Sequence, residues 1–265
     1  MSHQNIHPIV SVIIPAYNSE KTLEEAIASV VLQDVAVELI LIDNASTDHT
    51  ADVMLYCQCK WKSPQISWKV IHCTKNFGAA AARNLGVEEA TAPYIAFLDS
   101  DDWWAEGKLK QQLKLLHETR GIICSTAREF ATPEGKLTGH IVPVKQVITY
   151  RDLLHDNAIN CSSVLITADV AKEFPMKYDA YHEDYITWLR ILKKYKVAYG
   201  INEPLLKYRY WTGSKSSNKW KSMKKHYCSL RCVGIHPLKA LWYSGFYVMK
   251  GIHKYWRIRR RYHDS

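Results

Sequence analysis

The chain has 265 residues, of which 47% are hydrophobic and 23% charged, an ordinary balance for a folded globular protein. That length suits one large α/β domain or a domain with an appendage. The segment from Met1 to Pro8 lacks the basic and apolar parts of a secretory signal, and no apolar run approaches the roughly 18 residues of a membrane-spanning helix. Seven cysteines without zinc-ligand spacing indicate reduced, buried thiols in a cytosolic protein.

The positive charge is concentrated at the C-terminal end. The formal net charge is +9, from 35 basic and 26 acidic residues. From Lys219 onward there are twelve basic residues and a single acid, Asp264, which leaves 23 basic and 25 acidic residues in positions 1–218. This asymmetry indicates an anionic partner at the C-terminus and argues against a broadly basic nucleic-acid-binding core.

Strand-like and helix-like segments alternate through the first half of the chain. The predicted strands are 9–14, 37–42, 68–72 and 94–98. A first helix is predicted behind a cap at Asn18 or Ser19, with Leu23, Ile27, Val30 and Val31 on one face. A second helix is predicted over 79–89, and a third has Leu109, Leu113 and Leu116 on its face. Such alternation implies right-handed crossovers and a mostly parallel sheet buried on both faces. Further along, 161–167 and 198–201 are predicted strands and 185–195 a helix. A polar break at 214–218 is predicted to separate a domain, 1–218, from a tail, 219–265.

The predicted strand 94–98 ends abruptly in three carboxylates, Asp99, Asp101 and Asp102. Ligands of open α/β sheets bind outside the carboxyl ends of strands, and carboxylates crowded there repel one another unless a cation lies among them. Hard oxygen ligands favour Mg²⁺ or Mn²⁺, which keep part of their coordination shell for substrate phosphates. The alternative is a solvated acidic turn that caps a helix.

Three other loops leave the ends of predicted strands, so a parallel sheet gathers all of them at one edge. They are Pro15–Asn18, Asp43–Ser46 and 76–84. Tyr17 offers an aromatic face for a base, and Asp43 and Asn44 offer hydrogen-bonding groups. Arg83 can counter phosphate charge in bidentate geometry. Taken singly, each has a structural alternative: a packed tyrosine, a helix cap or a surface ion pair.

A base is also needed if a nucleotide-sugar is activated for transfer, because the attacking hydroxyl must lose its proton. Glu183 and Asp184, adjacent at a predicted helix start, are the candidates in the second half. A helix N-terminus stabilises carboxylates as ions. The alternative is a capping acid pair without a chemical role.

In this order, the motifs resemble those of family 2 glycosyltransferases of the GT-A fold, over roughly residues 8–218. The segments that carry the resemblance are 11–18, 42–48, 76–84, 97–102 and 183–188. An Asp-x-Asp alone is not specific, whereas these motifs in the family's order are. The resemblance implies an α/β, Rossmann-like, mostly parallel sheet flanked by helices. It also implies a nucleotide-binding half at about 1–110 and an acceptor half at 111–218.

The resemblance also implies roles for individual residues, in three groups. The base-binding residues are Pro15, Ala16, Tyr17, Asp43 and Asn44. The residues at the diphosphate are Asp99 and Asp101, which hold the metal, with Ser100 and Arg83. The acid pair is Glu183 and Asp184, of which Asp184 is the general base of an inverting displacement.

Two positions make this correspondence less direct. Many relatives carry a second acid where this chain has Asn44, placed to accept a hydrogen bond from uracil. An uncharged amide oxygen accepts that bond more weakly, so uridine is expected but thymidine and guanosine donors are less firmly excluded. Downstream, 208–216 resembles a segment that closes over the diphosphate in some relatives, which makes Arg209 a candidate ligand of the donor.

The tail interleaves cationic and aromatic side chains. Its aromatic residues include Trp220, Tyr227, Trp242, Tyr243, Phe246, Tyr247, Tyr255 and Trp256. Cations attract anionic lipid headgroups, and Trp and Tyr settle at the headgroup level, so the pattern favours one or two interfacial helices divided by Pro237. Two other interpretations are stacking on nucleic-acid bases and ordinary packing of the tail on the domain.

The leading hypothesis is therefore a Mn²⁺- or Mg²⁺-dependent inverting enzyme that transfers a hexosyl or N-acetylhexosaminyl group. It would move the sugar from a nucleotide-sugar, preferably a UDP-sugar, to a glycan or lipid-linked acceptor. The expected location is the cytoplasm, at the inner face of the cell membrane, with the tail on anionic lipid and no nucleic-acid partner. The resemblance suggests bacterial surface-polysaccharide biosynthesis as the pathway. The alternative is a nucleotide-sugar-binding protein without turnover that acts through its tail.

Overall fold

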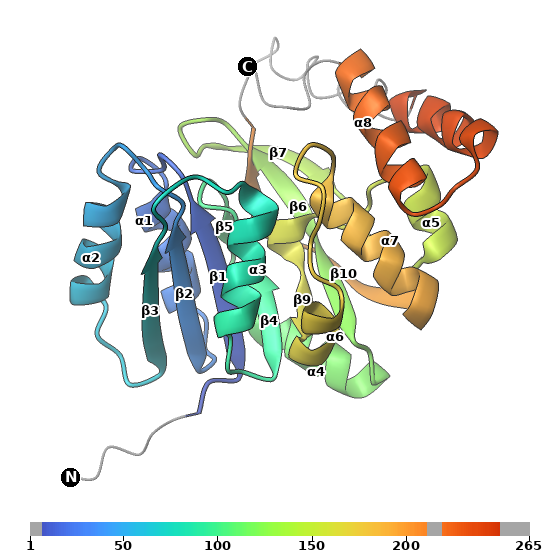
Figure 1. Ribbon diagram of the computed structural model, residues 1–265. Helices are drawn as coiled ribbons and strands as arrows, with labels where there is room; N and C mark the ends of the chain where they lie inside the picture. Colours follow the sequence, from blue (N-terminus) through green and yellow to red (C-terminus); the bar gives the residue numbers. More distant parts are fainter. Residues whose placement is uncertain (1–6, 211–218, 250–265) are drawn as a thin grey trace.

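The computed structural model describes residues 7–210 and 219–249, which form a central sheet with helices on both faces (Figure 1). The strands are β1 (Val10–Ala16), β2 (Val37–Asp43), β3 (Ile66–His72), β4 (Tyr94–Phe97), β5 (Trp103–Trp104), β6 (Ile123–Ala131), β7 (Leu137–Val142), β8 (Val147–Thr149), β9 (Leu165–Thr167) and β10 (Val197–Arg209). The helices are α1 (Leu23–Val31), α2 (Thr50–Lys60), α3 (Ala79–Glu89), α4 (Lys108–Thr119), α5 (Tyr150–His155), α6 (Ala168–Glu173), α7 (Glu183–Tyr195) and α8 (Lys219–Cys232), with a 3₁₀ turn η1 (Cys161–Ser163) and a further helix over 237–249.

The first four strands, β1 to β4, pair with one another in parallel, as predicted. The sheet order is β3-β2-β1-β4-β9-β6-β10-β5, with β7 beside β6 and β8 beside β10. β1 lies between β2 and β4, parallel to both, so the loops that follow these strands emerge at the same edge. β1 continues through Pro15, which pairs with Ile42, and ends at Ala16.

The second half of the sheet is mixed. β9 is antiparallel to both β4 and β6, whereas β6 and β10 are parallel. The predicted strand 161–167 is shorter than expected, because its first three residues form η1 before β9 begins at Leu165. This turn brings Ser162 back under the acidic loop, where its Oγ accepts a hydrogen bond from Asp99 N at 3.1 Å.

Alternate residues of the strands supply two separate core layers. Val12 and Ile14 of β1 pack with residues of α1, α2 and α4, whereas Ile13 packs with α3 and α7 on the other face. α3 approaches the sheet closely because Gly86 has no side chain. A Cβ there would lie 2.5 Å from Ile13 Cγ2. This close approach sets the position of α3, which carries Arg83, beside the loops at the strand ends.

The C-terminal helices pack on the domain beside α5 and α7 (Figure 1). Leu230 of α8 and Ala240 of the helix 237–249 are fully buried and belong to the same core layer as Ile13. The described part of the tail therefore packs on the domain, which was one of the three interpretations of this segment. Tyr255 and Trp256 lie outside the described residues. Within the described part of the chain, no helix combines the length and apolar character needed to cross a bilayer.

Candidate active site

Arg83 joins the two parts of the predicted site. From the middle of α3, its Nη2 contacts Asp99 Oδ1 at 2.5 Å and its Nη1 contacts Glu183 Oε1 at 2.8 Å. Its side chain is only 6% exposed. The acidic loop after β4 and the start of α7 are thus connected through one buried guanidinium. The sequence predicted each of these residues, and the structure brings them together.

Asp184 follows Glu183 at the start of α7 and is half-buried. Burial raises its pKa to about 7, and the charge of Glu183 adds to the increase, whereas Arg83 opposes it. Asp184 Oδ1 accepts a hydrogen bond from Tyr185 N at 2.7 Å, which fixes the carboxylate at the start of α7. A carboxylate with a pKa near neutrality can accept a proton and release it again at physiological pH.

The acidic loop contains one deeply buried carboxylate, Asp102. Burial raises its pKa well above the ordinary value, and the charges of Asp101 and Asp99 raise it further. Asp102 Oδ1 accepts from Arg209 N at 3.1 Å, whereas Oδ2 is buried without a hydrogen bond. Beside them, Ser100 Oγ lies 2.7 Å from Ser19 Oγ, which links the loop to the end of β1.

This crowding of carboxylates suits a divalent cation. Mutual repulsion and an unsatisfied buried oxygen are the features that a bound cation would relieve. Among residues 7–210 and 219–249, no three His, Cys, Asp or Glu side chains are arranged to hold a metal by themselves. A cation at Asp99 and Asp101 therefore needs further ligands, and diphosphate oxygens are the kind that Mg²⁺ and Mn²⁺ accept.

Asp43 is held as a charged group at the end of β2. Its Oδ1 accepts from Ser46 N at 2.9 Å, and its Oδ2 lies 3.2 Å from His72 Nδ1. Burial alone would raise the pKa of Asp43, but the bonds from Ser46 and His72 lower it below the ordinary value. Tyr17, at the neighbouring loop, is 49% exposed and leaves its ring face accessible.

Asn44 is buried and its amide fastens the loop before α3. Its Nδ2 donates to Asn76 Oδ1 at 3.0 Å and to Gly78 O at 3.2 Å, and its Oδ1 accepts from Phe77 N at 3.0 Å. Both ends of the side chain are thus engaged by protein. Contact of Asn44 with a base stays a prediction, and the geometry gives this residue a scaffolding role that the sequence did not indicate.

The residues that end β1 serve partly as loop anchors. Ala16 is buried, and its carbonyl accepts from Asn44 N at 2.9 Å, whereas Pro15 is partly exposed. The predicted cap at Asn18 or Ser19 is wrong, because the N-cap residue of α1 is Thr22 and the helix begins at Leu23. The side chain of Asn18 instead accepts from Thr47 N at 2.8 Å and connects this loop to the one after β2.

Arg209 lies behind the acidic loop. Its guanidinium donates to Asp101 O at 2.9 Å and Pro133 O at 2.7 Å, pairs with Glu25, and lies 4.9 Å from the centre of the Trp103 ring. The side chain is almost fully buried. These contacts make Arg209 a support for the loop that carries Asp101, and its predicted contact with a donor diphosphate stays untested.

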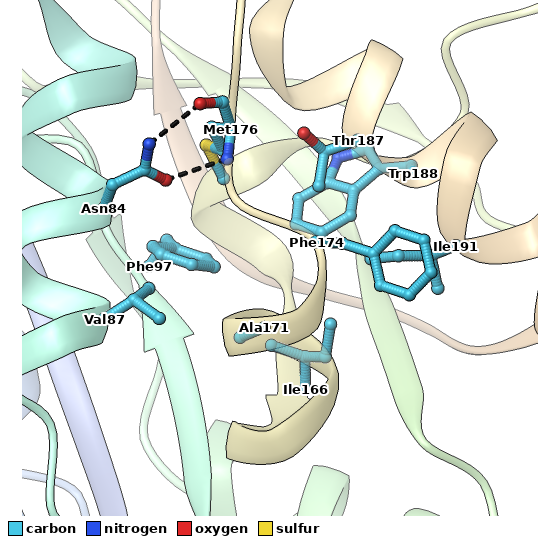
Figure 2. Close-up of a pocket in the computed structure, with 10 residues that line it drawn as sticks. All are labelled: Asn84, Val87, Phe97, Ile166, Ala171, Phe174, Met176, Thr187, Trp188 and Ile191. Carbon is cyan, nitrogen blue, oxygen red and sulfur yellow. Dashed lines mark hydrogen bonds between the residues drawn. The ribbon is translucent and has the colours of Figure 1, made fainter. Parts of the chain in front are cut away.

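Two residues that fasten the segment before α7 escaped the sequence reasoning. Asn84, next to Arg83, makes a pair of 2.8 Å hydrogen bonds with the backbone of Met176 at the rim of a small apolar cavity (Figure 2). Asp179 Oδ1 accepts from Ala80 N at 2.7 Å, at the start of α3. These contacts hold the segment 174–182 on α3 and so place the acid pair beside Arg83. Their partners lie 92 and 99 residues apart in sequence, so local patterns gave no signal for them.

The comparisons with known proteins agree with this geometry. The model of the family described as Glycosyl transferase family 2 matches residues 11–167, and this chain belongs to that family. It is 34% identical over 252 residues to "Putative teichuronic acid biosynthesis glycosyltransferase TuaG" of Bacillus subtilis, covering 94% of this chain and 98% of that protein. It is 32% identical over 250 residues to "UDP-Glc:alpha-D-GlcNAc-diphosphoundecaprenol beta-1,3-glucosyltransferase WfgD" of Escherichia coli, covering 93% and 95%.

A solved structure confirms the fold. The mannosyltransferase PcManGT of Pyrobaculum calidifontis, in complex with GDP-Man and Mn²⁺, matches with a TM-score of 0.69 at 17% identity, over 92% of this chain and 70% of that one. The predicted GT-A fold and the predicted class of enzyme, a glycosyltransferase, are therefore confirmed.

Proposed function

We propose that this enzyme is a metal-dependent inverting glycosyltransferase that moves a sugar from a UDP-sugar to a hydroxyl of a lipid-linked glycan, with Asp184 as general base. One observation carries the proposal. The half-buried Asp184, whose pKa is about 7, adjoins Glu183, and Arg83 connects Glu183 to Asp99 of the acidic loop. The name of WfgD, which states a UDP-Glc donor and a diphosphoundecaprenol-linked acceptor, supports the choice of substrates. The Mn²⁺ complex of PcManGT supports the choice of metal.

In this mechanism the Asp184 carboxylate takes the proton of the acceptor hydroxyl while the hydroxyl oxygen forms a bond to the anomeric carbon of the donor sugar. The bond from that carbon to the diphosphate oxygen breaks, and its electron pair leaves with the nucleoside diphosphate. Attack opposite to the leaving group inverts the configuration. Asp99 and Asp101 would hold a divalent cation, which supplies stabilisation of the charge on the departing diphosphate. Arg83 holds Asp99 and Glu183 close to each other.

The test is donor binding by calorimetry, with UDP-, GDP- and dTDP-sugars, each with and without Mn²⁺. The expected result is Mn²⁺-dependent binding of a UDP-sugar that Asp101→Ala abolishes. In Asp184→Asn the donor should bind as in the wild type, while turnover falls by about a thousandfold or more, as for loss of a general base. Equal binding without metal, or normal turnover in Asp184→Asn, contradicts the proposal.

The C-terminal helices also support attachment to an anionic membrane surface. The helix 237–249 exposes a continuous apolar face, whose residues Leu238, Leu241, Trp242, Phe246 and Met249 are 37% to 73% exposed. The opposite face, with Ala240 and Ser244, is buried against the domain. Exposed Lys224 and Lys239 lie on the same helical pair, which belongs to the strongly basic end of the chain. An apolar face flanked by cations is the pattern of an interfacial helix.

Vesicle sedimentation tests this attachment. The wild type should pellet with vesicles that contain phosphatidylglycerol and less with vesicles of phosphatidylcholine alone. Leu241→Asp should lower the bound fraction severalfold. Leu55→Asp, the same change at an equally accessible leucine of α2, is the matched control and should bind normally. Unchanged sedimentation of Leu241→Asp would remove this face from the account.

A further inference from the structure

The first turn of α7 has no cap of its own. Its N-cap residue, His182, makes no side-chain hydrogen bond to the turn, although this turn carries Glu183 and Asp184. Four backbone N–H groups at a helix start need partners or water. One partner comes from α8, because Ser229 Oγ accepts from His182 N at 3.4 Å. Ser229 is fully buried and donates its own proton to Lys225 O.

α8 also holds the residue on the other side of the acid pair. The ring of His226 stacks on that of Tyr185, with centroids 5.2 Å apart and planes at 22°. On its other face lies the ring of Tyr247, at 4.2 Å and 10°. Tyr185 and His226 are completely buried. The Tyr185 ring therefore lies at one end of a stack whose other two rings belong to the C-terminal helices.

The hydrogen bonds of this stack connect His226 to Tyr185 and to the helix 237–249. His226 Nε2 lies 3.2 Å from the Tyr185 hydroxyl, which donates its proton to Leu153 O at 2.6 Å. His226 Nδ1 lies 3.0 Å from Ser244 Oγ, which donates to Ala240 O at 2.8 Å. Burial lowers the pKa of His226 to about 3, so the ring is neutral and carries its proton on one of its two nitrogens.

We infer that His226 and Ser229 are positioning residues that hold Asp184 in place for proton transfer. His182 and Tyr185 flank the acid pair, and Tyr185 N is the group that donates to Asp184 Oδ1. A shift of Tyr185 therefore moves the Asp184 carboxylate. The inference rests on the proposed role of Asp184 as base, and assigns the C-terminal helices a part in catalysis.

The experiment uses full-length His226→Phe, which keeps a stacking ring but loses both hydrogen bonds, and Ser229→Ala. Ser29→Ala is the matched control, because Ser29 is buried and, like that of Ser229, its hydroxyl donates to a carbonyl of its own helix, Ala26 O of α1. The probe is release of UDP from UDP-glucose with Mn²⁺, and the second measurement is amide exchange over residues 182–186 by mass spectrometry. Neither needs the natural acceptor.

His226→Phe should lower kcat by about tenfold with KM for UDP-glucose unchanged, since a small displacement of a base costs rate more than binding. Amides 182–186 should exchange faster in His226→Phe and Ser229→Ala, and not in Ser29→Ala. In an Asp184→Asn background, His226→Phe should add nothing. His226→Gln, which can donate and accept, should recover part of the rate.

Contrary results separate the two proposals. Unchanged kcat and exchange in His226→Phe and Ser229→Ala overturn the inference, as does an equal fall in rate in the Asp184→Asn background. If Asp184→Asn itself keeps normal turnover, the proposed general base is wrong, whatever α8 does. If His226→Phe does not fold, Ser229→Ala and Tyr185→Phe give the same readouts.

Discussion

Replacing Arg83 by methionine is the most direct test of how the site is held together. The side chain of Arg83 is 6% exposed, and those of its partners Asp99 and Glu183 are 33% and 17% exposed. Methionine fills a similar volume but leaves two carboxylates unpaired. Breaking a buried ion pair costs about 3–5 kcal/mol of unfolding free energy. Because Asp99 keeps some contact with water, we expect about 3 kcal/mol, near the lower end of that range.

Urea denaturation followed by tryptophan fluorescence measures this cost. Lys69→Met is the matched control, because Lys69 pairs with Glu89 at the surface, with side chains 38% and 43% exposed, and should lose less than about 1 kcal/mol. Adding Glu183→Gln to Arg83→Met should recover about 1 kcal/mol, since one unpaired charge is removed. If Arg83→Met costs no more than Lys69→Met, the buried guanidinium does not hold the site.

Three other predictions concern groups whose surroundings set their behaviour. Because burial and the charge of Glu183 raise the pKa of Asp184 to about 7, turnover should rise with pH through that value, and Glu183→Gln should shift the rise to lower pH. An unchanged midpoint of the pH profile in Glu183→Gln would show that Glu183 does not raise this pKa. Burial lowers the pKa of Lys108 from 10.5 to about 7, so the unfolded chain binds the proton more tightly than the folded chain. Between roughly pH 7 and 9 the unfolding free energy of the wild type should therefore rise by about 2 kcal/mol relative to that of Lys108→Met. The same pH dependence in both proteins would contradict a lowered pKa of Lys108. Thr149 and Asp152 form the capping box of α5, so Thr149→Ala should lower the unfolding free energy by about 1 kcal/mol in urea titrations, and no loss would show that the box is dispensable.

The sequence was sufficient for the parts of the site that depend on strand ends. The apolar runs before Pro15, Asp43 and Asp99 predict parallel strands, and parallel strands bring the following loops to one edge. β1, β2 and β4 confirm this arrangement. The helices predicted over 79–89 and 185–195 required no tertiary information, because their composition is a local signal. In the structure the second of them begins two residues earlier, at Glu183.

Sequence patterns did not predict the contacts between segments that are far apart in the chain. Asn44 and Arg209 have the residue types of ligands, but their partners come from loops that only the folded chain brings near. In the tail, composition predicted an interfacial helix but not the stack of Tyr185, His226 and Tyr247. Spacing along one helix shows which side chains share a face, and cannot show which ring of another helix lies against that face.

The two-sided helix 237–249 has a practical consequence for anyone who wishes to obtain this enzyme in a detergent-free form. Shortening the chain before this helix would remove an apolar surface, and it would also remove Ser244 and Tyr247, the partners of His226. An inactive truncated product would then say nothing about whether lipid is required. Polar replacements confined to the exposed Leu238, Leu241 and Met249 leave the buried face of the helix, with Ala240 and Ser244, unchanged. They would therefore show the effect of the apolar surface on solubility without a change at the partners of His226.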